Sequence, residues 1–323
     1  MSDCESRAAR TPPAGARGSE TGRSDPPAAD ASGAHALLAV ATEAATGAGA
    51  LLLERAHHGA ERHVSSKSTP TDLVSEADLA SERAIRELLA RRRPDDGFVG
   101  EEGDHVEGTN GLSWVVDPLD GTVNFLFGIP QWCVSVAVRD ARGTVAGAIY
   151  DPNRDELFSA ARGAPAALST PRGTIALGAS CAVGGRAIDG EDAGAVGAHT
   201  VAGAGASATR PWAGDLAMAM IATGLAYDAR VRIAQGRVLA GLVGRVRDIR
   251  RFGSAALDLA WTAAGRYDAY FERSVKQWDI AAGVLICESA GLRVLELPER
   301  EDLPWGILVA RLALCEELLA LVG

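Results

Sequence analysis

The sequence lacks the features on which several common classes of protein depend. Its 323 residues include five cysteines, which lie far apart and form no C-x-x-C pair, so the sequence predicts neither a disulfide framework nor a zinc ribbon. No stretch approaches the roughly 18 uninterrupted apolar residues of a membrane span, and the first residues contain no apolar signal-peptide core. We therefore expect a cytoplasmic protein with no membrane partner.

Several catalytic motifs are also missing. The sequence contains no G-x-S-x-G elbow, no G-x-x-x-x-G-K-[ST] loop and no H-E-x-x-H helix, and its six histidines form no pair at ligand spacing. Positive charge is scarce as well, since 42 acidic residues against 32 basic ones give a net charge of −10. This balance argues against a nucleic-acid partner, because neutralising phosphates requires a surplus of cations.

Composition divides the chain into a tail and a folded part. Residues 1–34 contain no Leu, Ile, Val, Phe, Tyr or Trp, so they cannot bury enough apolar surface to offset the entropy of ordering. We predict a disordered tail there and a folded domain over residues 35–323. Within that domain, residues 164–212 are rich in Gly, Ala and Ser and have weak periodicity, and we regard them as a divergent segment.

The order of the periodic segments predicts layered sheets with helices between them. Strands come first in a run and later alternate with helices, and Ser75 with Asp78 predicts a capping box at the start of one helix. The expected helices cover residues 36–58, 76–93, 213–223, 231–244, 254–264, 278–290 and 311–321. The expected strands cover residues 97–100, 113–117, 132–140, 144–151, 156–160, 267–272, 292–297 and 306–310.

The most informative segment is Trp114–Phe125, which reads WVVDPLDGTVNF. A buried strand ends there in two carboxylates, Asp117 and Asp120, which need positive compensation if they are desolvated. Gly121 and Thr122 follow and can offer free backbone N–H groups to an anion such as phosphate. Ligation by oxygen alone points to Mg²⁺ or Mn²⁺ rather than zinc. The alternative is a solvated Asp-Pro-x-Asp-Gly turn, which is common.

Further acidic positions could add to such a site. Glu101 and Glu102 follow a strand at a glycine-framed turn, Glu272 ends another strand, and Asp279 opens an apolar helix. Two of these features also have a purely structural interpretation: an exposed acidic turn for the glutamate pair and a helix N-cap for Asp279.

Lysine is rare enough to draw attention to Lys67. Only Lys67 and Lys276 occur among the 32 basic residues, so a compact ammonium group at Lys67 can be a requirement of the site. With so few lysines, chance is an equal alternative.

Together and in this order, these segments resemble the inositol monophosphatase family of metal-dependent, lithium-sensitive sugar phosphatases. The resemblance covers about residues 36–163 and 214–297. Its most specific motifs are D-P-[IL]-D-G-T-x-N-F and W-D-x-A-A-G, and the G-E-E turn and the K-…-D-L-V-[ST]-x-x-D segment support them. The resemblance implies an α+β/α/β layered sandwich of the αβαβα, sugar-phosphatase type, a homodimer, and two or three Mg²⁺ ions per subunit.

The resemblance also implies the metal ligands. Glu101, Asp117 and the backbone carbonyl of Leu119 would hold a first Mg²⁺. Asp117, Asp120 and Asp279 would hold a second. Paired metals of this kind stabilise both the attacking and the leaving oxygen of an in-line displacement.

The remaining implied roles concern water and substrate. Glu101 and Thr122 would orient and deprotonate the attacking water, with Asp78 accepting a hydrogen bond from the Thr122 hydroxyl. The amides of Gly121 and Thr122 would receive the phosphate. The residues implied to line the substrate are Asp120, Gly121, Thr122, Ala255, Glu272 and Asp279.

The implied activity is hydrolysis of a small phosphomonoester, with inositol 1-phosphate as the first expectation. The same mechanism could act on histidinol phosphate, a bisphosphorylated sugar such as fructose bisphosphate, or a 3′-phosphoadenosine nucleotide, and a catalytically silent binding or regulatory member is a third hypothesis. Glu272 favours a polyol, because a carboxylate suits hydroxyl donors and would repel a second phosphate. Val123 stands where many members have a second threonine, and residues 298–323 look abbreviated.

Overall fold

The computed structural model describes residues 31–57, 64–66, 73–103, 105–178 and 213–323. The tail expected over residues 1–34 lies outside the described residues except at its end, where helix α1 (Ala31–His57) begins. Ala34 is already buried in that helix, so the folded part starts earlier than the composition predicts. A helix can pack through small residues alone, which a search for large apolar side chains does not detect.

Seven strands form the larger sheet, in the order β3-β4-β5-β6-β7-β8-β9. They are β3 (Gly97–Gly100), β4 (Ser113–Asp120), β5 (Cys133–Asp140), β6 (Gly143–Asp151), β7 (Glu156–Ala161), β8 (Ala167–Thr170) and β9 (Gly173–Ala176). Every neighbouring pair is antiparallel except β3 with β4. Strand β5 is buried on both faces over most of its length, as apolar residues on both sides predict.

Five strands form the smaller sheet, in the order β11-β10-β12-β14-β13. They are β10 (Met220–Thr223), β11 (Asp248–Arg250), β12 (Ala269–Arg273), β13 (Arg293–Leu297) and β14 (Gly306–Ala310). Strand β10 runs parallel to β11 and β12, whereas β14 is antiparallel to β12 and β13. A separate two-stranded ladder joins β1 (Val64–Ser66) to β2 (Leu73–Ser75).

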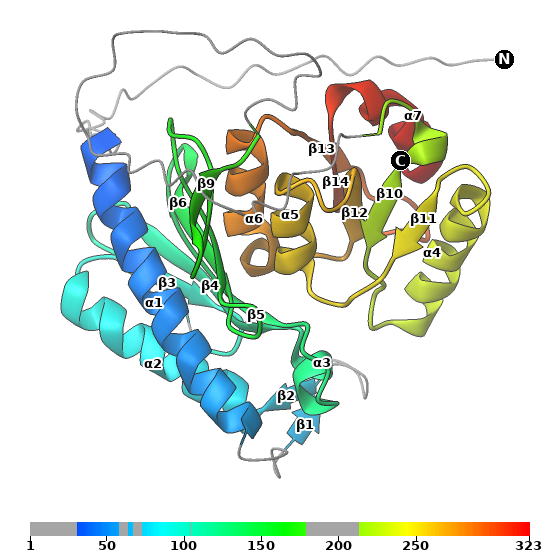
Figure 1. Cartoon of the computed structure of the whole chain (residues 1–323). Coiled ribbons are helices and arrows are strands. Elements are labelled where there is room, and N and C mark those ends of the chain that lie inside the picture. The colour runs from blue at the N-terminus through cyan, green and yellow to red at the C-terminus, as the bar shows by residue number, and fades with distance from the viewer. Residues whose placement is uncertain (1–30, 58–63, 67–72, 104, 179–212) are drawn as a thin grey trace, which may run out of the picture.

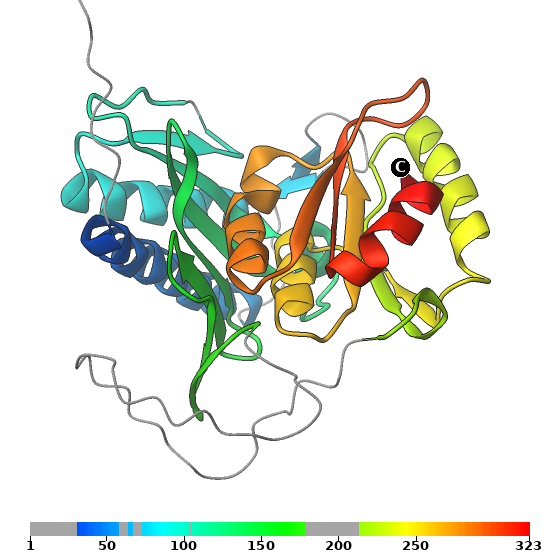
Figure 2. The ribbon, with the colours of Figure 1, turned by 90° about the horizontal axis from the view of Figure 1, so that it is seen from above.

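Helices cover the outer face of each sheet and fill the space between the sheets (Figures 1 and 2). Helices α1 and α2 (Glu76–Arg92) pack on the larger sheet, and α4 (Ala229–Leu242) and α7 (Leu312–Val322) cover the far face of the smaller one. Helices α5 (Ala255–Ala263) and α6 (Gln277–Ser289) lie between the two sheets. The predicted αβαβα sandwich is confirmed, with a buried apolar cluster at each level where helices meet a sheet.

The helix predicted over residues 213–223 is wrong. The segment contains a 3₁₀ turn, η1 (Leu216–Met218), followed by strand β10, whose Ile221, Ala222 and Thr223 are buried. A short apolar run is compatible with a buried helix or a central parallel strand, and pairing with β11 and β12 decides between them. The sequence also does not predict β8, β9 or β11, which are short strands near sheet edges.

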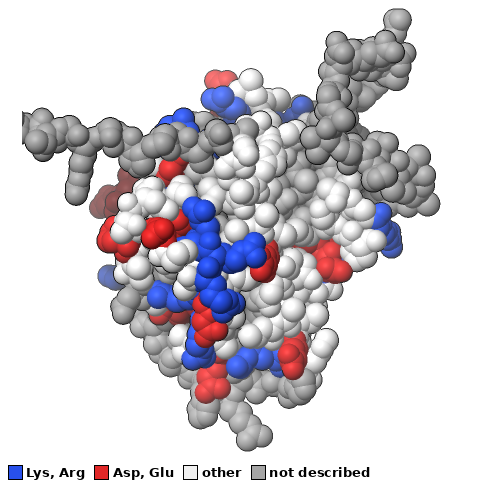
Figure 3. All heavy atoms as spheres, turned by 90° about the vertical axis from the view of Figure 1, so that its left-hand side faces the viewer, with Lys and Arg blue, Asp and Glu red and all other residues white. Residues whose placement is uncertain are grey.

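Helix α1 has the length and hydropathy of a membrane span over Ser32–His57, with a mean hydropathy of 1.7. A search for uninterrupted apolar runs does not find it, because polar residues such as Glu43 interrupt the run. One face of the helix, including Leu37 and Leu52, is buried in the cluster that α1 forms with the larger sheet. On the outer face, Glu43 pairs with Arg92 of α2 at 3.2 Å, and Figure 3 shows charges of both signs mixed over this side of the molecule. In this structure α1 is therefore a core helix of the sandwich.

Candidate active site

The two carboxylates at the end of β4 are buried, so the turn that carries them is not a solvated one. Asp117 is 2% exposed and Asp120 is 8% exposed. The Leu119 N–H donates to Asp117 Oδ1 at 3.0 Å, and Ser81 Oγ donates to the Pro118 carbonyl at 2.7 Å. The pairing of β4 with β5 is irregular between the two aspartates, which frees their side chains from the strict alternation of a strand.

The short helix α3 (Thr122–Leu126) begins directly after this turn. Gly121 precedes it with a φ of +101°, a conformation that favours glycine, and a Cβ at this position would lie 2.9 Å from the Gln131 carbonyl oxygen. The hydroxyl of Thr122 donates to Asp78 Oδ1 at 2.8 Å and also lies 3.1 Å from the Leu119 carbonyl oxygen. The turn thus delivers a buried hydroxyl beside the two aspartates.

Asp78 joins helix α2 to this hydroxyl. Its Oδ2 accepts hydrogen bonds from the Ser75 N–H at 2.9 Å and from Ser75 Oγ at 2.6 Å, which completes the predicted capping box. Its Oδ1 accepts from Thr122. The same fully buried carboxylate therefore caps a helix and fixes the direction of the threonine hydroxyl.

Asp120 connects the two sheets through the N-terminus of α5. Its carboxylate accepts hydrogen bonds from Ser254 Oγ at 2.6 Å, from the Ala256 N–H at 2.7 Å and from the Ala255 N–H at 3.3 Å. These donors and the helix dipole favour the charged form. Burial nevertheless raises the pKa of Asp120 to about 6, and the charge of Glu101 adds to the increase.

Asp279 lies in the first turn of α6 rather than at its N-cap. Its Oδ2 accepts from the Lys276 N–H at 2.6 Å. Burial raises the pKa of Asp279 well above its usual range, and the charges of Glu101, Asp120 and Glu272 raise it further. Because these acids act on one another, they face a common region between the sheets.

Glu272 comes from β12 on the opposite side of that region. The Tyr270 hydroxyl donates to Glu272 Oε2 at 2.9 Å. Burial raises the pKa of Glu272 to about 7, while the hydrogen bond from Tyr270 and the charge of Arg251 lower it. Nearby Asp258 is buried, and neither of its carboxylate oxygens has a hydrogen-bond partner within the described residues.

The structure groups most of the site residues expected from the sequence. Hydrogen bonds or adjacency in the chain link six of them, and the charges of three more act on the same acids. The linked residues are Asp78, Asp117, Leu119, Asp120, Thr122 and Ala255, and the others are Glu101, Glu272 and Asp279. Lys67 lies outside the described residues. Sequence reasoning missed Ser254, because a hydrogen bond to a residue 134 positions away leaves no local pattern. It also missed the role of Tyr270, because a tyrosine two residues from a glutamate on a strand is not distinctive.

The chemistry of these side chains fits a hard divalent cation. The donors are oxygens, and the charged neighbours that raise the pKa values of Asp120 and Asp279 are all acidic, so a cation would relieve their repulsion. Among the described residues, no three His, Cys, Asp or Glu side chains already converge at ligand distance. The carboxylates would therefore have to close around an ion.

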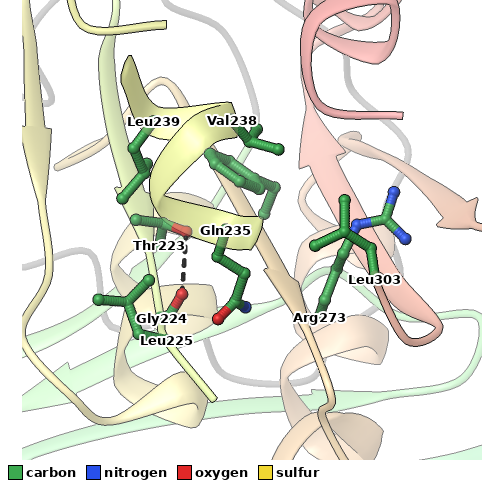
Figure 4. A pocket seen from close by; sticks show the side chains of 9 residues that line it. Thr223, Gly224, Leu225, Gln235, Val238, Leu239, Arg273 and Leu303 are labelled. Carbon is green, nitrogen blue, oxygen red and sulfur yellow. Dashed lines mark hydrogen bonds between the residues drawn. The ribbon is translucent and has the colours of Figure 1, made fainter. Parts of the chain in front are cut away.

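A small cavity lies behind β12, next to Gly224, Gln235, Phe271 and Arg273 (Figure 4). Its volume is about 10 Å³, close to the minimum for one water molecule, and no carboxylate lines it. Phe271 and Arg273 alternate along β12 with Tyr270 and Glu272, whose side chains face the acidic region. The cavity therefore lies on the other face of β12 from Glu272, with Gly224 next to both.

The model of the inositol monophosphatase family matches residues 34–321. The chain belongs to this family. It is 40% identical over 263 residues to an inositol-1-monophosphatase of Mycobacterium bovis, which covers 80% of each chain. It is also 38% identical over 253 residues to the Nus factor SuhB of Xylella fastidiosa, which covers 78% of each chain. Membership confirms the predicted enzyme class, a phosphoric monoester hydrolase.

Solved structures of inositol monophosphatase relatives have the same fold. Mycobacterium tuberculosis SuhB superposes with a TM-score of 0.67 at 35% identity, over 88% of this chain and 95% of that one. The suhB protein of Bartonella henselae gives a TM-score of 0.71 at 32% identity, over 89% and 98% of the two chains.

Proposed function

We propose that this member of the family is a cytoplasmic, Mg²⁺-dependent phosphatase that hydrolyses inositol 1-phosphate. The observation that carries the proposal is the buried hydrogen bond from Thr122 to Asp78 beside Asp117 and Asp120. A hydroxyl oriented by a carboxylate next to a desolvated acid cluster suits activation of water for attack on phosphate. The names of relatives such as the M. bovis inositol-1-monophosphatase support the substrate.

The acidic side chains are proposed to hold two Mg²⁺ ions, and Mn²⁺ suits the same donors. Glu101, Asp117 and the Leu119 carbonyl would hold one ion, and Asp117, Asp120 and Asp279 the other. When bound, the ions lower the pKa of a coordinated water and offset charge on the phosphate oxygens. Asp117 would contribute to both sites.

The chain's own groups then act on the water and the phosphate. Thr122 and Glu101 would hold the attacking water and take up its proton, and Asp78 keeps the Thr122 hydroxyl in one direction. The amides of Gly121 and Thr122 would receive phosphate oxygens. Glu272 and Ala255 would line the side occupied by the leaving alcohol.

The polyol side of the proposal depends on Glu272. A carboxylate accepts hydrogen bonds from ring hydroxyls and repels a second phosphate, which favours inositol phosphate over fructose bisphosphate or a 3′-phosphoadenosine nucleotide. Histidinol phosphate remains a substrate to test. A catalytically silent member would need to have lost a ligand, and the sequence retains all of Glu101, Asp117, Asp120, Thr122 and Asp279.

The proposal includes a homodimer. Phe127, Ile129 and Phe252 are 73%, 48% and 39% exposed, and Asn124 Nδ2 donates to the Phe252 carbonyl at 2.7 Å, which brings these segments together. Grouped apolar side chains on a surface are typical of protein interfaces. Sedimentation equilibrium of the purified chain tests the assembly state.

Phosphate release measured with Mg²⁺ over inositol 1-phosphate, histidinol phosphate, fructose bisphosphate and a 3′-phosphoadenosine nucleotide tests the function. We expect inositol 1-phosphate to give the highest kcat/KM. Glu272→Gln keeps the shape and removes one acceptor oxygen, so kcat/KM for inositol 1-phosphate should fall about tenfold to a hundredfold, with a much smaller loss for a simple aryl phosphate. Equal losses on both substrates would contradict the polyol role.

A further inference from the structure

Glu272, the acid proposed to face the leaving alcohol, is held by a single hydrogen bond within the described residues. Among the described residues, its only hydrogen bond comes from the Tyr270 hydroxyl, which donates to Oε2 at 2.9 Å. Oε1 receives none there, so it is the oxygen left for a ligand. A glutamate has three rotatable side-chain bonds, so a single contact decides where its carboxylate rests.

Charges of both signs act on the Glu272 carboxylate. Asp120 raises the pKa of Glu272, and the charge of Glu272 in turn raises the pKa values of Asp258 and Asp279. Arg251 is the cation that acts on it. Within the described residues, the hydrogen bond from the Tyr270 hydroxyl to Oε2 is what holds the carboxylate in place beside these acids.

Tyr270 holds its hydroxyl group in a fixed place. Its side chain is 0% exposed and belongs to the apolar cluster between the sheets. Tyr270 and Glu272 are two residues apart on β12, so they project from the same face of the strand. The hydroxyl makes no other hydrogen bond within the described residues.

Gly224 packs directly against the Glu272 carboxylate. A Cβ at this position would collide with the Glu272 carboxylate, so the bare backbone is what admits it. The carboxylate therefore packs against the Gly224 backbone and accepts a hydrogen bond from the Tyr270 hydroxyl.

We infer that Tyr270 is a positioning residue for substrate selection, which fixes the Glu272 carboxylate so that Oε1 faces the hydroxyls of the leaving polyol. The inference rests on the proposed role of Glu272. Tyr270 itself does not touch the substrate, and its effect is confined to substrates whose alcohol carries hydroxyl groups.

Tyr270→Phe tests the inference, because it removes the hydroxyl and keeps the ring. Loss of one hydrogen bond to a charged group should raise the KM for inositol 1-phosphate about tenfold, with kcat within about twofold and a smaller change in KM for a simple aryl phosphate. A merely structural role would lower the melting temperature and affect both substrates alike.

Tyr150→Phe is the matched control. The Tyr150 hydroxyl also donates to a carboxylate, Asp155 Oδ1, at the same distance of 2.9 Å, but on the larger sheet. This variant should leave the ratio of the two KM values unchanged. Gly224→Ala places a methyl group against the carboxylate and should lower the preference for inositol 1-phosphate in the same direction as Tyr270→Phe.

Glu272→Gln separates the two ways in which the inference can fail. If Glu272→Gln lowers the preference for inositol 1-phosphate and Tyr270→Phe does not, the positioning role is wrong and the proposed function stands. If Glu272→Gln leaves the preference unchanged, both the polyol role and the positioning role are wrong. If both hold, adding Tyr270→Phe to Glu272→Gln should cost little more, because the two changes act through one carboxylate.

Discussion

The acids on the phosphate side of the site and those on the alcohol side are supported differently. Among the described residues, Asp78 and Asp120 each accept at least three hydrogen bonds at 3.3 Å or less, from side chains and from backbone N–H groups at helix starts. On the alcohol side, Glu272 accepts one and Asp258 none within the described residues. The phosphate side is pre-organised, while the alcohol side has spare acceptors and can be adapted to different alcohols.

The largest expected effect is the loss of turnover when Asp117, on the phosphate side, is replaced. Asp117→Asn retains the oxygen that accepts from the Leu119 N–H but removes the charge proposed to serve both Mg²⁺ sites. We expect turnover to fall more than about a thousandfold at saturating Mg²⁺, with an unchanged melting temperature in the absence of metal. Steady-state phosphate release and a thermal melt check this.

Asp140→Asn is the control for Asp117→Asn. Asp140 ends β5, at the opposite end of the β4–β5 ladder from Asp117. The substitution Asp140→Asn should therefore leave turnover unchanged. Turnover of Asp117→Asn within tenfold of the parent would contradict the two-metal proposal.

A smaller effect, on Mg²⁺ affinity, is expected when the hydrogen bond from Ser254 to Asp120 is removed. Ser254→Ala removes the 2.6 Å hydrogen bond and should raise the Mg²⁺ concentration for half-maximal activity about tenfold, as loss of a group that orients a ligand does elsewhere. Calorimetric titration with Mg²⁺ alone should show the same loss of affinity.

Thr262→Val is the control for Ser254→Ala. The Thr262 hydroxyl donates to the Asp258 carbonyl at 2.6 Å on the same helix, away from Asp120, so the affinity for Mg²⁺ should not change. Equal affinities in Ser254→Ala and the parent would show that the two backbone N–H donors suffice to hold Asp120.

The smallest effect concerns the stability of the larger sheet away from the site. Arg162 hydrogen-bonds both oxygens of Asp140, at 2.9 and 2.8 Å, and this lowers the pKa of Asp140 below its usual value. A carboxyl whose pKa is lower in the folded state stabilises the protein above its unfolded pKa of about 3.9, and the contribution disappears as the pH falls through the folded value.

Urea unfolding of Asp140→Asn checks this pH dependence. We expect the variant to lose about 1 kcal/mol of unfolding free energy at pH 7 and the difference from the parent to shrink below about pH 4. A difference that stays constant from pH 7 to pH 3 would mean that packing, not charge, makes Asp140 stabilising.

The sequence predicted the phosphate side more completely than the alcohol side. Asp117, Asp120 and Thr122 lie within six consecutive residues, and Asp78 lies in a local capping pattern, so chain proximity reveals their chemistry. Ser254 reaches Asp120 through a tertiary contact, and Tyr270 reaches Glu272 along one face of β12. A serine or a tyrosine is too common in proteins for its presence alone to predict such a role.

The same reasoning explains the errors in the fold. Long helices with periodic apolar residues, and strands with two buried faces, were predicted close to their observed bounds. Strand β10 was predicted as part of a helix, because four residues cannot show a period and its pairing partners, β11 and β12, lie later in the chain. Tertiary pairing, not local propensity, determines such a segment.

The order of strands has a consequence for how members of this family can diverge. The larger sheet ends at β9, five strands away from β4, and the chain re-enters the described structure at Ala213, beside the smaller sheet. The length of chain between β9 and η1 can therefore change without altering the register of β4 or the spacing of Asp117, Asp120 and Thr122. Asp117 and Asp120 lie on an interior strand of the larger sheet, so the chain after its edge strand β9 can vary in length without disturbing them.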